Sequence, residues 1–302
     1  MQQFQSIKLA SEPLRTPLEQ FVSEHTGRKW TIAEARDMAE FACHPAAILS
    51  DGSYSVFAKF SEAANGLEQF EIELAGLRFL SERSGVLIPS PVGILQVAGG
   101  SILVLETVQA VERGPRHWRQ IGQALGRIHQ NKGERMGLDR NGYIGPIPMD
   151  NTPADNWAAF YTERRLLPLF RLAIDSGNLP ADMARQVELV ASRIPRLAGP
   201  EPIPTLLHGD AQQNNFISTE RGAVMIDPAM YYGNPEMDLA FIGMWQGPIP
   251  EDVFEAYQEE QPIEPDFQER IDLWRIWGYL AGVALEGPIH LPRLSGAVRK
   301  YL

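Results

Sequence analysis

The chain has 302 residues, of which 44% are hydrophobic and 22% charged, and its formal net charge is -11 at pH 7. This composition excludes disordered and fibrous proteins, and the length allows two lobes with separate hydrophobic cores. The acidic balance argues against nucleic acids and anionic membranes as partners, because their phosphates attract basic surfaces.

The first third of the chain has the pattern of strands arranged around one main helix. Apolar residues at helical spacing predict a short helix over residues 18–25 and a longer one over 67–83, with Gly85 as its stop. The sequence Ser50-Asp51-Gly52-Ser53 is a hairpin signal between two strands. Strands are expected over residues 30–35, 41–49, 54–60 and 101–106. One further strand is expected to end near residue 96. These elements predict a small sheet-based lobe.

Beyond Val108 the pattern changes to helices. The fragments LLHGD and AVMIDP are short extended pieces that interrupt this helical part. Helices are expected over residues 118–130, 157–172, 181–194, 254–260 and 267–285. The sequence therefore predicts an α+β protein with a strand-rich first lobe and a helical second lobe.

The N-terminus and the cysteine content indicate the compartment. The first residues have neither the basic start nor the apolar core of a signal peptide, and no uninterrupted apolar run is long enough to span a membrane. The single cysteine, Cys43, cannot form an internal disulfide, which agrees with a reducing compartment. We expect a cytoplasmic protein in which Cys43 is buried or incidental.

The stretch LLHGDAQQNNFISTERGAVMIDPAMYYGNPEMDLA, which begins at Leu206, concentrates residues that can bind a metal nucleotide. Mg²⁺ prefers hard oxygen ligands and takes the rest of its shell from phosphates and water, which suits Asn215 and Asp227. A carboxylate beside such a metal can orient an acceptor hydroxyl and take its proton, which suits Asp210. In the alternative interpretation, Asp210 and Asn215 only cap a turn.

Lys59 and Glu73 form a second candidate pair. The run Val56-Phe57-Ala58-Lys59 ends a strand with a lysine that can neutralise phosphate oxygens if an acidic residue fixes it, and Glu73 lies on the following helix. Alternatively, both are solvated surface residues. We interpret His208 as structural, and Tyr231 with Tyr232 as packing residues. All the candidate polar residues occur together, in the order along the chain that the catalytic interpretation requires. Independent accidents do not produce such an order, so it favours the catalytic interpretation.

These motifs resemble those of the fructosamine or ketosamine-3-kinase family, which belongs to the protein-kinase-like fold together with the aminoglycoside phosphotransferases. The resemblance covers residues from about 15 to the C-terminus. It is carried by LLHGD followed by Asn215, MIDPAMYYGNPEMDLA, ELAGLRFL, LVLETV and GYIGPIPMDNTPADNWAAFYTERRLLP. The resemblance implies a bilobal α+β fold, with a small antiparallel sheet and one main helix in a nucleotide-binding lobe over residues 1–106. A larger helical lobe over residues 107–302 would carry the catalytic and metal-binding loops.

The resemblance also implies an ATP- and Mg²⁺-dependent kinase that phosphorylates a hydroxyl of a small molecule or glycated amine. Lys59 would contact the α and β phosphates and pair with Glu73. Asp238 would brace the catalytic loop. The remaining implied roles are the catalytic base for Asp210, Mg²⁺ ligation for Asn215 and Asp227, and backbone hydrogen bonds to adenine for Glu106 and Val108.

The chain departs from the family in three places. The region AEARDMAEFACHP has no glycine where the family has a glycine-bearing turn over the phosphates. Residues 211–214 read Ala-Gln-Gln-Asn in place of Leu-Trp-Ser-Gly, and YLAGVALEG lacks the Asn and His of the family's last helix. We expect a ketosamine as the acceptor, with an aminoglycoside, a choline-like molecule or another hydroxyl acceptor as the alternative. A catalytically weak nucleotide-binding protein is the other interpretation.

Overall fold

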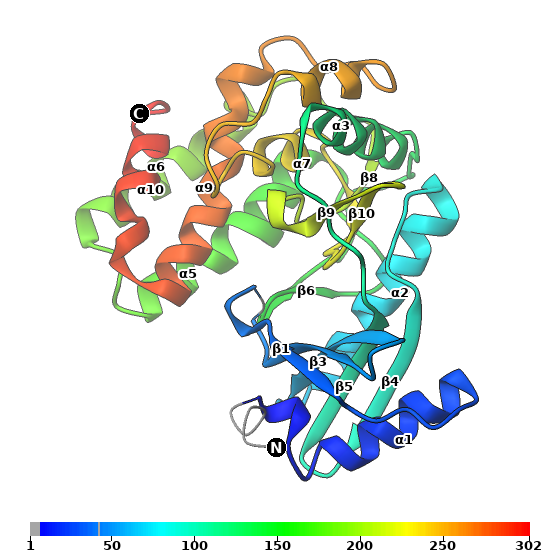
Figure 1. The fold of residues 1–302 in the computed structure, drawn as a ribbon. Coiled ribbons are helices and arrows are strands. Elements are labelled where there is room, and N and C mark those ends of the chain that lie inside the picture. The colour runs from blue at the N-terminus through cyan, green and yellow to red at the C-terminus, as the bar shows by residue number, and fades with distance from the viewer. Residues whose placement is uncertain (1–6, 42) are drawn as a thin grey trace. The chain divides into compact units, whose positions relative to one another are not determined.

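The computed structural model describes residues 7–41 and 43–302, which form two compact units. The sheet unit contains the described residues up to 81 together with 87–112 and 217–227. The helical unit contains residues 82–86, 113–216 and 228–302. Figure 1 shows the elements of both units. The expected lobe boundary after Glu106 stays a prediction, and the two units are described separately.

The sheet unit is built on a five-stranded antiparallel sheet. The hairpin predicted at Ser50-Asp51-Gly52-Ser53 is confirmed, with Asp51 Oδ1 accepting the amides of Ser53 at 2.9 Å and Tyr54 at 2.8 Å. The strand order is β1 (Glu34–Asp37), β2 (Ala46–Ser50), β3 (Ser55–Ser61), β5 (Gly100–Glu106) and β4 (Pro91–Val97).

The first two strands begin later in the chain than predicted. The amides of Trp30 and Ile32 donate to side chains of Ser23 and Glu19 and not to a strand, so the apolar character of this segment reflects burial. Residues Ala39–Phe41 form the 3₁₀ turn η2, and β2 starts only at Ala46. Cys43, within this region, is exposed.

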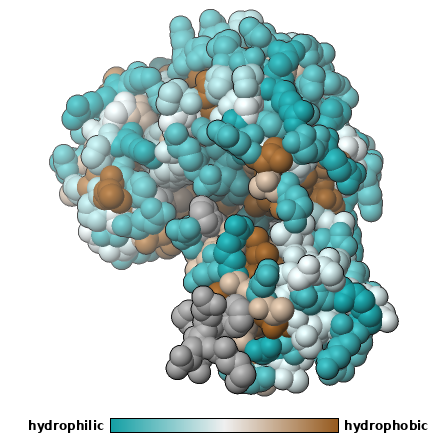
Figure 2. Space-filling view, in the orientation of Figure 1, coloured by the Kyte–Doolittle hydropathy of each residue, from teal (hydrophilic) through white to brown (hydrophobic). Residues whose placement is uncertain are grey.

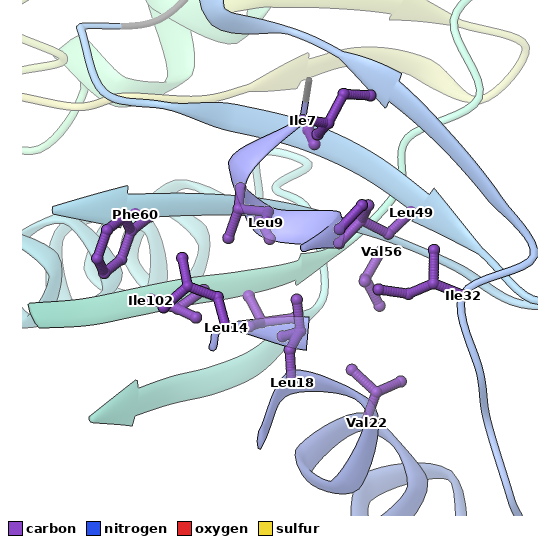
Figure 3. Packing of buried hydrophobic residues seen from close by; sticks show 14 of the residues in the cluster. Ile7, Leu9, Leu14, Leu18, Val22, Ile32, Leu49, Val56, Phe60 and Ile102 are labelled. Atoms are coloured by element: carbon purple, nitrogen blue, oxygen red, sulfur yellow. The ribbon is translucent and has the colours of Figure 1, made fainter. Parts of the chain in front are cut away.

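The two faces of the sheet are covered by different helices. One face packs against η1 (Lys8–Ala10) and α1 (Arg15–Thr26), and Figure 3 shows the hydrophobic side chains that fill this layer. The other face packs against α2 (Gly66–Ser84), whose Phe70, Leu74 and Leu77 contact Leu103 and Leu105 of β5. Side chains along a strand point alternately to the two faces of the sheet. A strand residue that adjoins a residue of the α1-side core in sequence therefore points toward α2.

A short hairpin of β9 (Phe216–Thr219) and β10 (Gly222–Met225) completes the sheet unit. The Met225 amide donates to Leu87 O at 2.8 Å, which fixes the chain immediately before Asp227. This tertiary bond explains why residues distant in sequence belong to the sheet unit.

All five helices predicted for the second half are confirmed, with small shifts at their ends. The segment predicted over 157–172 contains a π-helical piece, η3, between two α-helices. The short helices α7 and α10 were not predicted, because one has six residues and the other contains a proline and a glycine. The helices are α3 (Pro115–His129), α4 (Trp157–Phe160), η3 (Tyr161–Leu166), α5 (Leu167–Asp175), α6 (Ala181–Leu197), α7 (Glu236–Phe241), α8 (Asp252–Gln258), α9 (Phe267–Glu286) and α10 (Leu291–Arg299), with the short helices η4 (Gln213–Asn215) and η5 (Pro288–His290).

Two small strand pairs lie among these helices, β6 (Gly142–Ile144) with β7 (Ile147–Met149) and β8 (Thr205–Leu207) with β11 (Tyr231–Gly233). Tyr231 is fully buried and stacks on Phe160, with the Arg165 guanidinium 4.0 Å from its ring centre. The interpretation of Tyr231 as a packing residue is therefore confirmed.

The face of the molecule in Figure 2 is mainly polar. In the view of Figure 2, hydrophobic residues form small separate patches among hydrophilic ones. Across the residues that the structure describes, no helix combines the length and apolar character needed to cross a membrane.

Candidate active site

Lys59 is the centre of a charged cluster in the sheet unit. It lies on β3, opposite Ala46 of β2 and Leu103 of β5, on the face that α2 covers. Its ammonium group donates to Glu73 Oε1 at 2.9 Å and also bonds Asp227 Oδ1. Only 6% of the residue is exposed, so the interpretation of Lys59 as a solvated strand-end lysine is wrong.

Glu73 reaches Lys59 because of its position on α2. Phe70 and Leu77, one turn away on either side, pack against the sheet and direct this side of the helix toward β3. Burial is the main cause that raises the pKa of Glu73 to about 7, while Lys59 opposes the shift and Asp227 adds to it. Two carboxyl groups share one ammonium group here, so a further cation beside them would favour the ionised form of Glu73.

Asp227 is held in a backbone conformation that is uncommon for residues other than glycine. Its φ is 53°, in the left-handed region. Such conformations persist where the surrounding structure fixes them, and they are frequent at functional sites. The side chain of Asp227 is 30% exposed although it bonds Lys59. It can therefore contact a ligand while it remains next to the lysine.

The end of β5 is fixed by hydrogen bonds on both sides. The Glu106 amide donates to Ser90 O at 2.8 Å, and the next amide, of Thr107, donates to Ser55 O at 3.0 Å. The Tyr54 hydroxyl donates to Glu106 Oε1 at 3.0 Å, and burial followed by this contact raises the pKa of Tyr54 to about 12. These bonds set the direction of the chain that leads to Val108.

In the helical unit, Asp210 and Asn215 lie together in the loop after β8. Asn215 Nδ2 donates to Asp210 Oδ2 at 2.9 Å and to Asp210 O at 2.8 Å. Gln212 Nε2 lies 3.3 Å from Asp210 Oδ1 and 3.1 Å from Oδ2. Two carboxamide groups thus orient the Asp210 carboxylate. The bond to Asp210 O also closes the loop, as the turn-capping interpretation requires.

The loop itself is held by Asp238, the third residue of α7. Asp238 Oδ2 accepts the His208 amide at 2.7 Å, and Oδ1 accepts the Gly209 amide at 3.0 Å. His129 Nε2 lies 3.1 Å from Asp238 Oδ2, and the other nitrogen of this ring lies 2.8 Å from the Tyr257 hydroxyl. The expected contact of Asp238 with this loop is confirmed, whereas the catalytic role of the loop stays a prediction.

Gly209 adds a steric reason for the loop conformation. Its φ is 82°, and a Cβ at this position would lie 2.0 Å from Ala229 O. A residue with a side chain is therefore excluded between His208 and Asp210.

The structure thus groups the predicted residues by unit. Lys59, Glu73 and Asp227 are in contact in the sheet unit, and Asp210 contacts Asn215 in the helical unit. The roles of these residues, and of Glu106 and Val108 in adenine binding, stay predictions. Within residues 7–41 and 43–302, no group of three or more His, Cys, Asp or Glu side chains is arranged to hold a metal ion.

Sequence reasoning missed two residues of the helical unit, His129, which contacts Asp238, and Gln212, which contacts Asp210. His129 is 109 residues from Asp238, and no spacing rule connects them. Gln212 was noted only as a departure from the family pattern, whereas its side chain contacts both carboxylate oxygens of Asp210.

Comparison with known sequences identifies related proteins over most of the chain. A protein from Synechocystis that is named a probable ketoamine kinase is 32% identical over 267 residues, which cover 87% of this chain and 88% of the relative. The ketosamine-3-kinase of mouse is 27% identical over 252 residues, which cover 74% of this chain and 81% of the relative.

Comparison with solved structures identifies the same fold. A Thermobifida fusca protein assigned as a fructosamine-3-kinase is 31% identical, with a TM-score of 0.81, over 94% of this chain and 98% of that chain. A spectinomycin phosphotransferase, solved with ADP and spectinomycin, has a TM-score of 0.57 at 19% identity over 95% of this chain and 93% of that chain. The predicted kinase-like α+β fold is confirmed. The model of the fructosamine kinase family matches residues 15–302, and the chain belongs to this family.

Proposed function

We propose that this protein is an ATP-dependent kinase that phosphorylates a hydroxyl group of a ketosamine, either a small molecule or a glycated amine. Membership of the fructosamine kinase family supports this function. The observation that carries it is the buried cluster of Lys59, Glu73 and Asp227. A lysine fixed by a helix glutamate and placed beside a carboxylate is the arrangement that holds nucleotide phosphates and their metal in kinases.

The sheet unit would bind the nucleotide. Lys59 would contact the α and β phosphates, and Glu73 would keep the ammonium group in place when a ligand draws Asp227 away. The backbone carbonyl of Glu106 and the backbone amide of Val108 would pair with the adenine edge. The hydrogen bonds that fix the end of β5 support this assignment.

The donor atoms of Asn215 and Asp227 fit Mg²⁺. Asn215 directs its amide nitrogen to Asp210, which leaves Oδ1 as the side-chain atom for the metal. Asp227 offers carboxylate oxygens on a side chain that is 30% exposed although it bonds Lys59. When bound, Mg²⁺ would neutralise charge on the phosphate oxygens during transfer.

Asp210 would act on the acceptor. In the proposed reaction the acceptor hydroxyl oxygen bonds the γ-phosphorus, the bond between this phosphorus and the β–γ bridging oxygen breaks, and ADP leaves. The hydroxyl proton passes to the Asp210 carboxylate. Gln212 and Asn215 orient this carboxylate, and Asp238 holds the loop backbone.

An acceptor screen tests the proposal. ADP formation would be measured with Mg-ATP and, in turn, a ketosamine of a free amino acid, a glycated peptide, an amino sugar, an aminoglycoside and choline. The proposal predicts the highest kcat/KM with a ketosamine. A preference for an aminoglycoside or choline would replace the acceptor class. ATP binding without transfer to any acceptor would instead indicate a catalytically weak nucleotide-binding protein, as the glycine-free turn suggests.

A further inference from the structure

The turn between β1 and β2 has no glycine, and part of its backbone is already engaged within the protein. The Ala39 amide donates to Asp37 Oδ1 at 2.9 Å, and the Met38 amide donates to Ala46 O at 2.9 Å. Residues Ala39–Phe41 are wound into the 3₁₀ turn η2. Backbone amides that bind protein atoms are not available to phosphates, so a side chain of this turn is the alternative source of a donor for a nucleotide at Lys59.

His44 lies where such a donor is needed. It precedes Ala46 by two residues, and Ala46 is the partner of Lys59 across the sheet. His44 lies in the bend just before β2, and the Phe60 amide donates to O of the next residue, Pro45, at 2.8 Å, which holds this bend beside β3. The His44 ring makes an edge contact with Phe70 of α2, with 5.5 Å between ring centres, and this contact places the ring on the α2 side of the sheet, where Lys59 lies.

The surroundings of the ring connect it to the charged cluster. Burial, followed by the Lys59 charge, lowers the pKa of His44, while the Gln69 side chain and the Asp227 carboxylate oppose this effect. On α2, Gln69 lies one helical turn before Glu73. These two side chains therefore form a row that leads from the His44 ring to the charged cluster. His44 is half-buried, so part of the ring remains accessible.

We propose that His44 is a nucleotide-binding residue whose ring N–H donates a hydrogen bond to the phosphate chain, replacing the backbone amides of a glycine-bearing turn. This inference rests on the proposed function, because it assumes that the nucleotide phosphates bind at Lys59. Both protonation states of the ring carry at least one N–H, so the bond does not require a charged histidine.

The test is nucleotide binding by the full chain in the absence of an acceptor. Dissociation constants of Mg-ATP, Mg-ADP and adenosine would be measured by calorimetry for the unchanged protein, His44→Ala and His44→Gln. A hydrogen bond to a charged group is strong, so we expect His44→Ala to weaken Mg-ATP and Mg-ADP binding by about tenfold or more and leave adenosine binding unchanged. Glutamine keeps an N–H donor, so His44→Gln should regain part of the affinity.

Cys43→Ser is the matched control, because Cys43 is the exposed neighbour in the same turn. This variant should bind all three ligands as the unchanged protein does. Equal losses for Mg-ATP and adenosine in His44→Ala would assign His44 a structural role and overturn the inference, as would unchanged Mg-ATP affinity. If the unchanged protein binds Mg-ATP but transfers no phosphoryl group, the proposed function fails while the His44 comparison still decides the inference. If it binds no nucleotide, both fail.

Discussion

The Lys59 ammonium bonds the Asp227 carboxylate across 168 residues of sequence, and the same ammonium donates to Glu73 at 2.9 Å. The lysine is therefore positioned from two directions, by a helix that follows its strand and by the segment after β10. In the free protein Asp227 is already placed at the lysine, where it would meet a metal nucleotide.

Asp227→Ala should abolish the effect of Mg²⁺ on ATP binding. The variant loses the only carboxylate among the proposed metal ligands, while Lys59 keeps Glu73 as its partner and is not left as an unpaired buried charge. The measurement is the dissociation constant of ATP with and without Mg²⁺. Asp139→Ala, which removes a carboxylate whose side chain is 91% exposed, is the control and should change nothing. Unaltered Mg-ATP affinity in Asp227→Ala would exclude Asp227 as a ligand.

Glu73→Gln should lower turnover more than it lowers thermal stability. The side chain of Glu73 is only 16% exposed, and its burial beside Asp227 disfavours the ionised form, so an amide of the same shape is tolerated in the fold. Lys59 would then be held by Asp227 alone, and a nucleotide that draws Asp227 away would leave the lysine without a fixed direction. Paired measurements of kcat and the melting temperature decide this point. A large loss of stability with normal kcat would mean that Glu73 is structural.

Asp51 should make the stability of the sheet unit depend on acid pH. The hydrogen bond from Arg28, and then the amides of Ser53 and Tyr54, hold the pKa of Asp51 well below its ordinary value of 3.8. Because the pKa of Asp51 is lower in the folded protein, its carboxylate stabilises the fold fully above about pH 4. As the pH falls below this value, the Asp51 carboxyl takes up a proton more readily in the unfolded chain, and the stabilisation is lost. Asp51→Asn should remove this part of the acid dependence in melting curves recorded between pH 2 and 6. Identical acid profiles for the two proteins would contradict the assignment.

Asp238→Asn should destabilise the helical unit. Asp238 is 1% exposed and accepts two backbone amides, and asparagine has one acceptor oxygen for them. One buried amide would lose its partner, which costs about 1–3 kcal/mol. Chemical denaturation measures this loss directly. Glu188→Gln, a change on the exposed side of α6, provides the reference, and equal stability of the two variants would show that the hydrogen bonds of Asp238 do not stabilise the fold.

Sequence reasoning predicted the parts of the site that depend on local pattern. Lys59 and Glu73 are 14 residues apart, and a strand followed by an amphipathic helix brings two such positions together. The bond between Lys59 and Asp227 follows from no local rule and was not predicted, since the family resemblance implied only that both residues act on the metal nucleotide. The fold class followed from the change between strand and helix patterns, and the comparisons confirm it.

Contacts between distant segments explain what could not be predicted. Trp30 and Ile32 have the composition of a strand, but their amides bind side chains of α1. His129 is one polar residue at the end of a helix until the fold places it beside Asp238. His44 likewise gains a possible role only because the strand register aligns Ala46 with Lys59.

The central claim is that Asp210 is the base of a phosphoryl transfer to a ketosamine, and Asp210→Asn tests it most directly. The substitution keeps the size of the side chain and removes its charge, and general-base catalysis contributes about 10²- to 10⁴-fold. The measurement is kcat for a ketosamine together with the dissociation constant of Mg-ATP. We predict that kcat falls by at least about 100-fold while Mg-ATP affinity is nearly unchanged. A variant that keeps most of its transfer activity would contradict this account.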